Sequence, residues 1–322
     1  FHWLLAWIGL ELNTLAIIPI IAKQHHPRAT EATTKYFLTQ AAASAMILFS
    51  STTNAWFSGT WDISQLTNPM SCTMLTLALS MKLGLAPLHF WLPEVLQGTP
   101  MKTALIIATW QKLAPITLLY LTHNSINPAL LLMMGLLSTL TGGWGGLNQT
   151  QTRKILAFSS IAHLGWMVSI ITLNPNIMLL NLTIYITMTA PMFLLLKLTT
   201  SKTIKDLTTT WTASPQVTTL MMLLLMSLGG LPPLTGFMPK WLILQELTTH
   251  NLTMTATIMA MSALLSLFFY LRLSYVSALT MHPTTTKTPN KWRFQPKSST
   301  TPITTLSTLS ILLLPMTPLL YV

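Results

Sequence analysis

The stretch GLAPLHFWLPE at residues 84–94 aligns without gaps with GLPPLTGFMPK at residues 230–240. The Gly, the Leu after it, a Pro, a second Leu and the later Pro are identical, and one aromatic residue is matched by another. A proline lacks an amide N–H and clashes with the preceding helical turn, so each stretch predicts a kink or an unwound segment. We therefore expect helix breaks at Pro87, Pro232 and Pro233.

Both stretches lie inside long apolar runs, and a membrane-spanning helix needs about 20 mostly apolar residues. About ten such runs follow one another, at residues 2–22, 36–57, 70–92, 101–122, 127–147, 153–173, 176–200, 215–247, 253–279 and 302–321. The joints between them are short and rich in Pro, Asn, Thr and Gly, as at residues 67–69, 127–128 and 174–175. The sequence thus predicts an all-α polytopic membrane protein with two discontinuous helices.

The two aligned stretches lie in the third and the eighth run, so an odd number of crossings separates them. They should therefore pass through the membrane in opposite directions, which is typical of the inverted repeats of transporters. We expect one transmembrane domain over residues 1–322, with repeat A at about 2–122, repeat B at about 127–279 and a C-terminal helix at about 302–321. A further helix is expected upstream of Phe1. Two unrelated proline kinks are the alternative.

The composition also indicates a membrane protein. Of the 322 residues, 51% are hydrophobic and 7% are charged, whereas soluble domains carry roughly 25% charged residues. The net charge of +11 would suggest nucleic acid for a soluble protein. The basic residues here lie in short loops between apolar runs, which excludes that partner. A single cysteine, Cys72, excludes a disulfide framework and a Cys-ligated iron–sulfur cluster within the chain.

Loop charges alternate along the chain in the manner of the positive-inside rule. Basic residues gather in the odd-numbered loops, at Lys23, Arg28, Lys35, Arg153, Lys154, Lys202, Lys205, Lys287, Lys291, Arg293 and Lys297. The even-numbered loops hold only Asp62. Glu94, near the third loop, is either a partner of a lysine or an interfacial charge.

Four charged residues lie at membrane depth, where a charge costs roughly 2.5–3.5 kcal/mol on insertion scales. They are Glu11, Lys82, Lys112 and Lys240. Charges retained at this depth usually face a cavity or a partner, so we expect them to form a proton path. Static buried ion pairing is the alternative.

Two histidines add to this set, because histidine titrates near neutral pH and suits a relay. His89 follows Lys82 by two helical turns, and His163 shares a polar stripe with Ser159 and Ser160. Interhelical hydrogen bonding is the alternative for both histidines. The chain contains no HExxH motif and no phosphate-binding loop, and its few carboxylates make a metal-cation site improbable.

Several long stretches together resemble one known family: residues 7–13, 35–40, 81–100, 109–115, 143–150, 153–157 and 227–241. The chain resembles the NADH–ubiquinone oxidoreductase chain 2 family, mitochondrially encoded antiporter-like subunits of respiratory complex I. The resemblance covers essentially the whole chain. It implies a Glu11 carboxylate paired with Lys82, a connecting Lys112, an exit-side Lys240, and His89 and His163 on the hydrated axis between them.

The resemblance further implies a subunit of a proton-translocating NADH:ubiquinone reductase in the mitochondrial inner membrane, with the odd loops toward the matrix. It implies other membrane-arm subunits as partners and contacts with inner-membrane phospholipids, cardiolipin among them. No cofactor is expected in this chain, and FMN, iron–sulfur clusters, NADH and ubiquinone are expected in partner subunits. A stand-alone cation/proton antiporter and a non-conducting structural subunit remain as alternatives.

Overall fold

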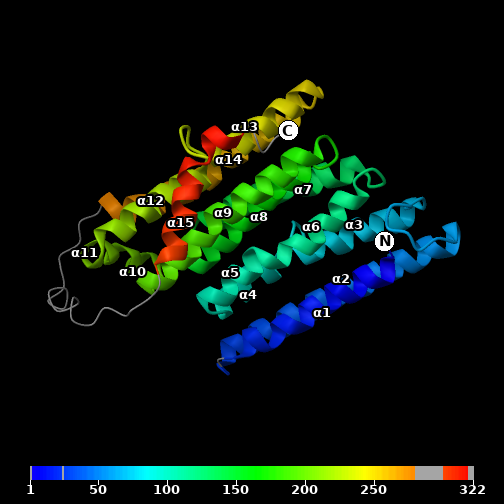
Figure 1. The fold of residues 1–322 in the computed structure, drawn as a ribbon, viewed down its shortest axis with the longest axis horizontal. Coiled ribbons are helices and arrows are strands. Elements are labelled where there is room, and N and C mark those ends of the chain that lie inside the picture. Colours follow the sequence, from blue (N-terminus) through cyan, green and yellow to red (C-terminus); the bar gives the residue numbers. More distant parts are fainter. Residues whose placement is uncertain (1, 24, 280–299, 318–322) are drawn as a thin grey trace.

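The computed structural model describes residues 2–23, 25–279 and 300–317, and within these ranges the chain is helical, with two isolated β-bridges and no strand. Figure 1 shows the helices lying side by side in one elongated bundle, with α1 and α2 at one edge and α13 and α14 at the other. The expected all-α class is confirmed.

The helices of the described ranges differ widely in length. They are α1 (Trp3–Ala22), α2 (Pro27–Ser58), α3 (Pro69–Leu83), α4 (Trp91–Gly98), α5 (Met101–Ala108), α6 (Trp110–Thr122), α7 (Pro128–Leu147), α8 (Thr152–Ile170), α9 (Pro175–Thr199), α10 (Ile204–Thr208), α11 (Thr210–Ala213), α12 (Pro215–Gly229), α13 (Phe237–Thr249), α14 (Thr253–Ser274), a π-helix η1 (Tyr275–Leu279), α15 (Thr301–Leu312) and a 3-10 turn η3 (Leu314–Met316).

Asn-Pro pairs begin three of these helices. Asn68, Asn127 and Asn174 each accept a hydrogen bond from the backbone N–H two residues on, and the next residue is the first of α3, α7 or α9. Asparagine is a preferred N-cap, and proline suits the first helical position because the N–H it lacks would have no helical partner there. The short joints found in the sequence are therefore helix starts.

Helix boundaries depart from the expected ones in three places. Helix α2 begins at Pro27 rather than at residue 36, because its first turns are polar and carry no apolar signal. The run 101–122 is divided at Thr109 into α5 and α6. In the run 302–321, helix α15 ends at Leu312, and residues 318–321 lie outside the described residues, as do Lys287, Lys291, Arg293 and Lys297.

The two aligned stretches have the same backbone geometry at their first residue. Helix α3 ends before Gly84, whose φ and ψ are 79° and 41°, and α12 ends before Gly230, with 78° and 41°. This left-handed conformation is open to glycine without strain and ends a helix. The next helices, α4 and α13, begin at Trp91 and Phe237, which correspond in the alignment.

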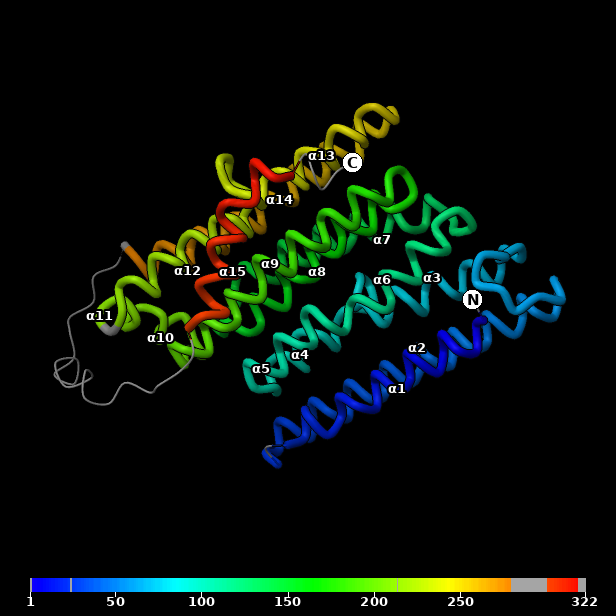
Figure 2. Tube along the Cα trace, viewed as in Figure 1, coloured from blue at the N-terminus to red at the C-terminus, as the bar shows by residue number. Residues whose placement is uncertain are grey.

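Helix α8 lies at the centre of the bundle, and every residue from Ser159 to Ile170 is buried. Its neighbour α7 approaches closely through small residues. A Cβ added at Gly142 would lie 2.6 Å from the Ala162 nitrogen, and one added at Gly165 would lie 2.8 Å from the Gly135 carbonyl oxygen. Figure 2 shows the traces of α7, α8 and α9 running together through the middle of the molecule. Such small-residue interfaces are how helices pack closely in membranes.

In the part of the chain that the structure describes, five helices or helix pairs are long and apolar enough to cross a membrane: Trp3–Ala22, Met101–Thr122, Pro128–Leu147, Pro175–Thr199 and Thr253–Ala278. The outer surface is apolar as well, since Trp56 is 87% exposed and Trp144 75% exposed. Extended apolar surface of this kind requires lipid or a protein neighbour to cover it. The fold is therefore that of an integral membrane protein.

Two arginines bind the carboxyl-terminal ends of neighbouring helices. Arg272 on α14 donates to the Leu147 carbonyl, the last of α7, over 2.8 Å. Arg153 on α8 donates to the Thr99 carbonyl just after α4. The last carbonyls of a helix have no helical partner and carry the negative end of its dipole, so a guanidinium stabilises them.

Candidate functional site: a row of buried polar groups

Lys112 lies beside the local break between α5 and α6, and only 2% of it is exposed. Its Nζ donates to the Tyr185 hydroxyl on α9 over 3.2 Å and lies 4.9 Å from the centroid of that ring. The Tyr185 hydroxyl in turn donates to the Ala108 carbonyl, the last of α5, over 3.2 Å. Because the helix is broken here, the Ala108 carbonyl can accept a hydrogen bond from the Tyr185 hydroxyl. The oxygen of the same hydroxyl accepts one from the buried Lys112 ammonium.

His163 on α8 continues this group on the other side of Tyr185. The two rings lie tilted with their centroids 5.4 Å apart. His163 is 6% exposed, and the charges of both Lys240 and Lys112 act on it. Ser159 and Ser160, which share its stripe, donate to the carbonyls of their own helix. His163 thus lies between two lysines that are far apart in sequence.

Lys240 lies at the second helix break. From the first turn of α13 its half-buried side chain reaches back, and its Nζ donates to the Gly229 carbonyl over 2.8 Å. Gly229 is the last residue of α12, so the ammonium lies at the negative end of that helix dipole. In the first break a neutral group takes the similar role, since Trp91 Nε1 donates to the Met81 carbonyl over 3.0 Å.

Glu11 and Lys82 lie close enough for the Glu11 charge to act on Lys82. Lys82 is 5% exposed. Within the described residues the two groups form no direct ion pair, and neither the Lys82 Nζ nor the Glu11 Oε2, both buried, has a hydrogen-bond partner. Buried charges without a partner are costly, so this pair raises the free energy of the folded molecule.

A reciprocal amide pair links the helix of Glu11 to the helix of Lys112. Asn13 Nδ2 donates to Gln111 Oε1 over 3.0 Å, and Gln111 Nε2 donates to Asn13 Oδ1 over 2.9 Å. The Tyr36 hydroxyl on α2 adds a longer contact of 3.4 Å to Gln111. Apart from this link, α1 packs mainly on α2. The amide pair is therefore a direct polar link between α1 and α6.

Asn13, Gln111 and Tyr185 were not among the residues selected from the sequence. Their common signal is a hydrogen-bonding side chain inside an apolar run, which in a membrane protein usually indicates an interhelical contact. That signal is weak, because Ser and Thr are abundant in the same runs and bond mostly to their own helix.

His89 has no described interaction with Lys112, Tyr185, His163 or Lys240. It lines a pocket of about 530 Å³ between α4, α7 and α8, together with Glu94, Trp144 and Lys154. Among the described contacts its nearest aromatic neighbour is Phe90, at 4.4 Å between ring centroids. The structure thus joins Lys112 to Tyr185, packs His163 against the same ring, and places His89 in the wall of a lateral pocket.

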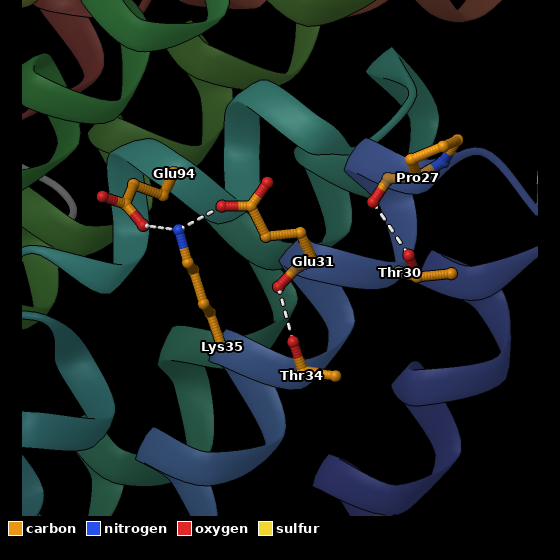
Figure 3. Close-up of polar contacts among 6 residues, drawn as sticks. All are labelled: Pro27, Thr30, Glu31, Thr34, Lys35 and Glu94. Atoms are coloured by element: carbon orange, nitrogen blue, oxygen red, sulfur yellow. Dashed lines mark hydrogen bonds and ion pairs between the residues drawn. The ribbon is translucent and has the colours of Figure 1, made fainter.

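Glu94 is a partner of a lysine, the first of the two interpretations open from sequence. Its Oε2 lies 2.6 Å from Lys35 Nζ, which also lies 2.5 Å from Glu31 Oε1 (Figure 3). The hydrogen bond from Lys35 and its charge lower the pKa of Glu31, and the bonds to Glu31 and Glu94 raise the pKa of Lys35. This exposed cluster joins α2 to α4 outside the apolar part of the bundle.

Among the described residues no group of three or more His, Cys, Asp or Glu side chains could hold a metal ion. The site instead consists of titratable side chains and hydroxyls placed where helices break. Such an arrangement can accept, hold and pass protons. The fold and site together define an antiporter-like transmembrane protein with a buried row of basic groups.

Comparison with known proteins agrees with that class. A model of the NADH:quinone oxidoreductase/Mrp antiporter transmembrane family matches residues 1–266, and a model of the NADH dehydrogenase subunit 2 C-terminus matches residues 267–321. NADH-ubiquinone oxidoreductase chain 2 of Xenopus laevis is 60% identical over 318 residues, which are 99% of this chain and 92% of the relative. The chain therefore belongs to the NADH–ubiquinone oxidoreductase chain 2 family.

Solved structures show the same fold. A chain of respiratory complex I from Thermus thermophilus has a TM-score of 0.89 at 26% identity, over 99% of this chain and 74% of that one. A chain of the Mrp complex from Dietzia has a TM-score of 0.86 at 16% identity, over 99% of this chain and 72% of that one. The second likeness concerns the fold alone.

Proposed function

We propose that this chain is a proton-translocating membrane-arm subunit of NADH:ubiquinone oxidoreductase, and so part of an enzyme whose redox chemistry takes place in partner subunits. One observation carries the proposal: Lys112 donates to Tyr185 and His163 packs against the same ring, in the buried centre of a complex I type fold. A structural scaffold has no need of basic groups without acidic partners at this depth, where each is costly.

The proposed path runs from Lys82 to Lys112, then through Tyr185 and His163 to Lys240. The Tyr185 hydroxyl is suited to an intermediate role because it accepts from Lys112 and lies in a ring that packs against His163. Each ammonium that gives up its proton becomes a neutral amine and can accept the next one, so charge and protons balance at every step. His89 is proposed as a branch of the path through its lateral pocket.

Glu11 and Lys82 are proposed as the coupling element. When the carboxylate lies near the lysine it favours the ammonium, and when the two separate the proton is more easily released toward Lys112. The Asn13–Gln111 pair connects α1, which carries Glu11, to α6, which carries Lys112. A shift of α1 would therefore displace Lys112. Moving one charge against 100 mV costs about 2.3 kcal/mol, so the drive has to come from the partner subunits.

The broken helices support an arrangement in inverted repeats. We propose that α3 with α4, and α12 with α13, each form one discontinuous crossing among about ten, in repeats at about 2–122 and 127–279. The nearly equal backbone angles of Gly84 and Gly230 support this assignment. The basic odd-numbered loops are proposed to face the mitochondrial matrix.

The proposed setting is the mitochondrial inner membrane, beside other membrane-arm subunits and phospholipids that include cardiolipin. NADH, FMN, the iron–sulfur clusters and ubiquinone are assigned to those partner subunits. The chain's single cysteine is in keeping with this division.

A second candidate function is cation/proton exchange by the chain alone, which the likeness of its fold to a chain of an Mrp complex favours. The sequence has 6 Asp and Glu residues against 17 Lys and Arg. Hard cations bind oxygen ligands, so the chain offers little for Na⁺.

Reconstitution separates these two functions. In liposomes containing the complete complex, we expect NADH oxidation to acidify the lumen. In liposomes containing the purified chain alone, we expect an imposed Na⁺ gradient to move no protons above the rate of empty liposomes, as read by a pH-sensitive dye. Na⁺-driven proton movement by the chain alone would establish the antiporter function instead.

Tyr185→Phe tests the proposed intermediate. The variant keeps the ring beside His163 but removes the hydroxyl, which leaves the Ala108 carbonyl and the Lys112 ammonium each with one partner fewer. A buried polar group left unsatisfied costs about 1–3 kcal/mol. We therefore expect the rate of proton translocation to fall roughly tenfold relative to the rate of NADH oxidation. Tyr275→Phe, at a tyrosine that is 57% exposed, is the matched control and should leave the rate unchanged. Equal rates for both variants would remove Tyr185 from the path.

A further inference from the structure

One cavity has a volume of about 1020 Å³ and lies where α1, α5, α8 and α9 end or begin. Six cationic side chains line it: Lys23, Arg28, Lys102, Arg153, Lys197 and Lys202. They come from segments that are distant in sequence, so the fold gathers them into one place. No Asp or Glu lines the cavity.

Within the described residues none of the six cations forms an ion pair with an acidic side chain, although the Arg28 charge acts on Glu31 and the Lys202 charge acts on Asp206. The ion pairs of the described residues involve Lys35 and His250, and neither lines the cavity. The Arg28 charge acts directly on Arg153 across the cavity wall. Like charges held together in this way favour an anionic partner from outside the chain.

Below the charges the cavity wall is apolar. Ile20 of α1, Met101 and Ile106 of α5, and Leu196 of α9 line it. Helix α1 lies at the outer edge of the bundle (Figure 1) and packs mainly on α2. Ile20, on that wall, is 41% exposed. A ligand that fits must combine an anionic group with hydrocarbon.

We propose that this cavity binds the headgroup of an anionic phospholipid, with the phosphate among the six cations and an acyl chain along Ile20 and Ile106. The basic residues lie at the ends of membrane-spanning helices, which is the depth of a lipid phosphate. The bound lipid would fill the space between α1 and α5, and so support the helix that carries Glu11 and Asn13. The lipid site stands independently of the proposed proton path.

The test measures lipid binding by the purified full-length chain, without turnover. Native mass spectrometry would follow the fraction of chain carrying cardiolipin or phosphatidylglycerol as each lipid is titrated, with phosphatidylcholine and inorganic phosphate as comparison probes. The cavity variant is Lys102→Gln with Lys202→Gln, both exposed residues whose replacement should leave packing intact. The matched control is Lys154→Gln with Lys205→Gln, which removes the same charge outside the cavity.

We expect the anionic lipids to bind the cavity variant about tenfold more weakly, because each basic residue contributes to attraction of an anionic headgroup. The control should bind within about twofold of the unchanged chain. Equal loss in both variants would show attraction by net charge alone and overturn the site. Equal binding of phosphatidylcholine would overturn anion recognition, and displacement of the lipid by inorganic phosphate at the same concentration would assign the cavity to a soluble anion.

Discussion

Lys112→Met is expected to stop proton transfer through this chain while leaving its fold intact. Methionine is unbranched and similar in length, so it should fill the space left by the lysine stem in the buried centre of the bundle. It cannot carry a proton, and Tyr185 loses the donor that now lies 3.2 Å from its hydroxyl. A positioned proton-transfer group typically contributes on the order of 10²–10⁴-fold in rate, so we expect a loss of at least about 100-fold through this path.

The measurement is the number of protons moved per NADH oxidised by the complete complex in liposomes. With this chain blocked, the ratio should fall to the share carried by the other subunits. Lys205→Met is the matched control, because Lys205 lies exposed on the short helix α10, away from the row. An unchanged ratio in a fully assembled Lys112→Met complex would favour the structural, non-conducting subunit.

Gly142→Ala is expected to destabilise the centre of the bundle. The added Cβ would lie 2.6 Å from the Ala162 nitrogen and 2.9 Å from both its Cα and its Cβ. These atoms belong to the backbone and first side-chain carbon of α8, so no rotamer change can relieve the clash and the two helices must separate. Overpacking of this kind typically costs about 1–3 kcal/mol.

The check is the thermal unfolding midpoint of the purified chain in detergent, which we expect to fall by several degrees. Gly9→Ala is the matched control, since a Cβ at Gly9 on α1 has nothing within 4 Å. Alanine is the better helix former, so the control should be unchanged or slightly more stable. A Gly142→Ala chain that melts with the control would mean that α7 and α8 do not pack as closely as described. Because α8 carries His163, the same separation should also slow proton transfer.

The aligned stretches at 84–94 and 230–240 show how much of the fold can be predicted from local sequence. Both were expected to interrupt their helices at prolines, and α3 and α12 do end there. The residue that ends each helix is the glycine before the prolines, through its left-handed backbone, and the prolines follow within the turn. The sequence therefore indicated where these two helices end, but not the backbone geometry of their ends, and a single discontinuous crossing at each stretch stays a prediction.

The residues of the candidate site show which parts of it the sequence could predict and which it could not. Glu11, Lys82, Lys112, His163 and Lys240 could be selected because a charge or an imidazole at membrane depth is costly and therefore conspicuous. Tyr185, Asn13 and Gln111 are uncharged, and nothing in their spacing says which helix they will face. His89 was expected on the same axis as the lysines, and this stays a prediction; the structure shows that it lines a pocket with Glu94 and Lys154.

The sequence by itself determined that the chain crosses a membrane, where its helices begin at Asn-Pro pairs, and which side chains would be charged in an apolar surrounding. These properties follow from the free energy of transferring each segment from water to lipid and from local backbone chemistry. Both depend on residues that are neighbours in the sequence. The tertiary structure alone decided that Lys112 meets Tyr185, that Asn13 meets Gln111, and that six basic residues surround one cavity. Such contacts depend on which faces of distant helices pack together, and that is set by the close fit of the whole bundle rather than by any one stretch.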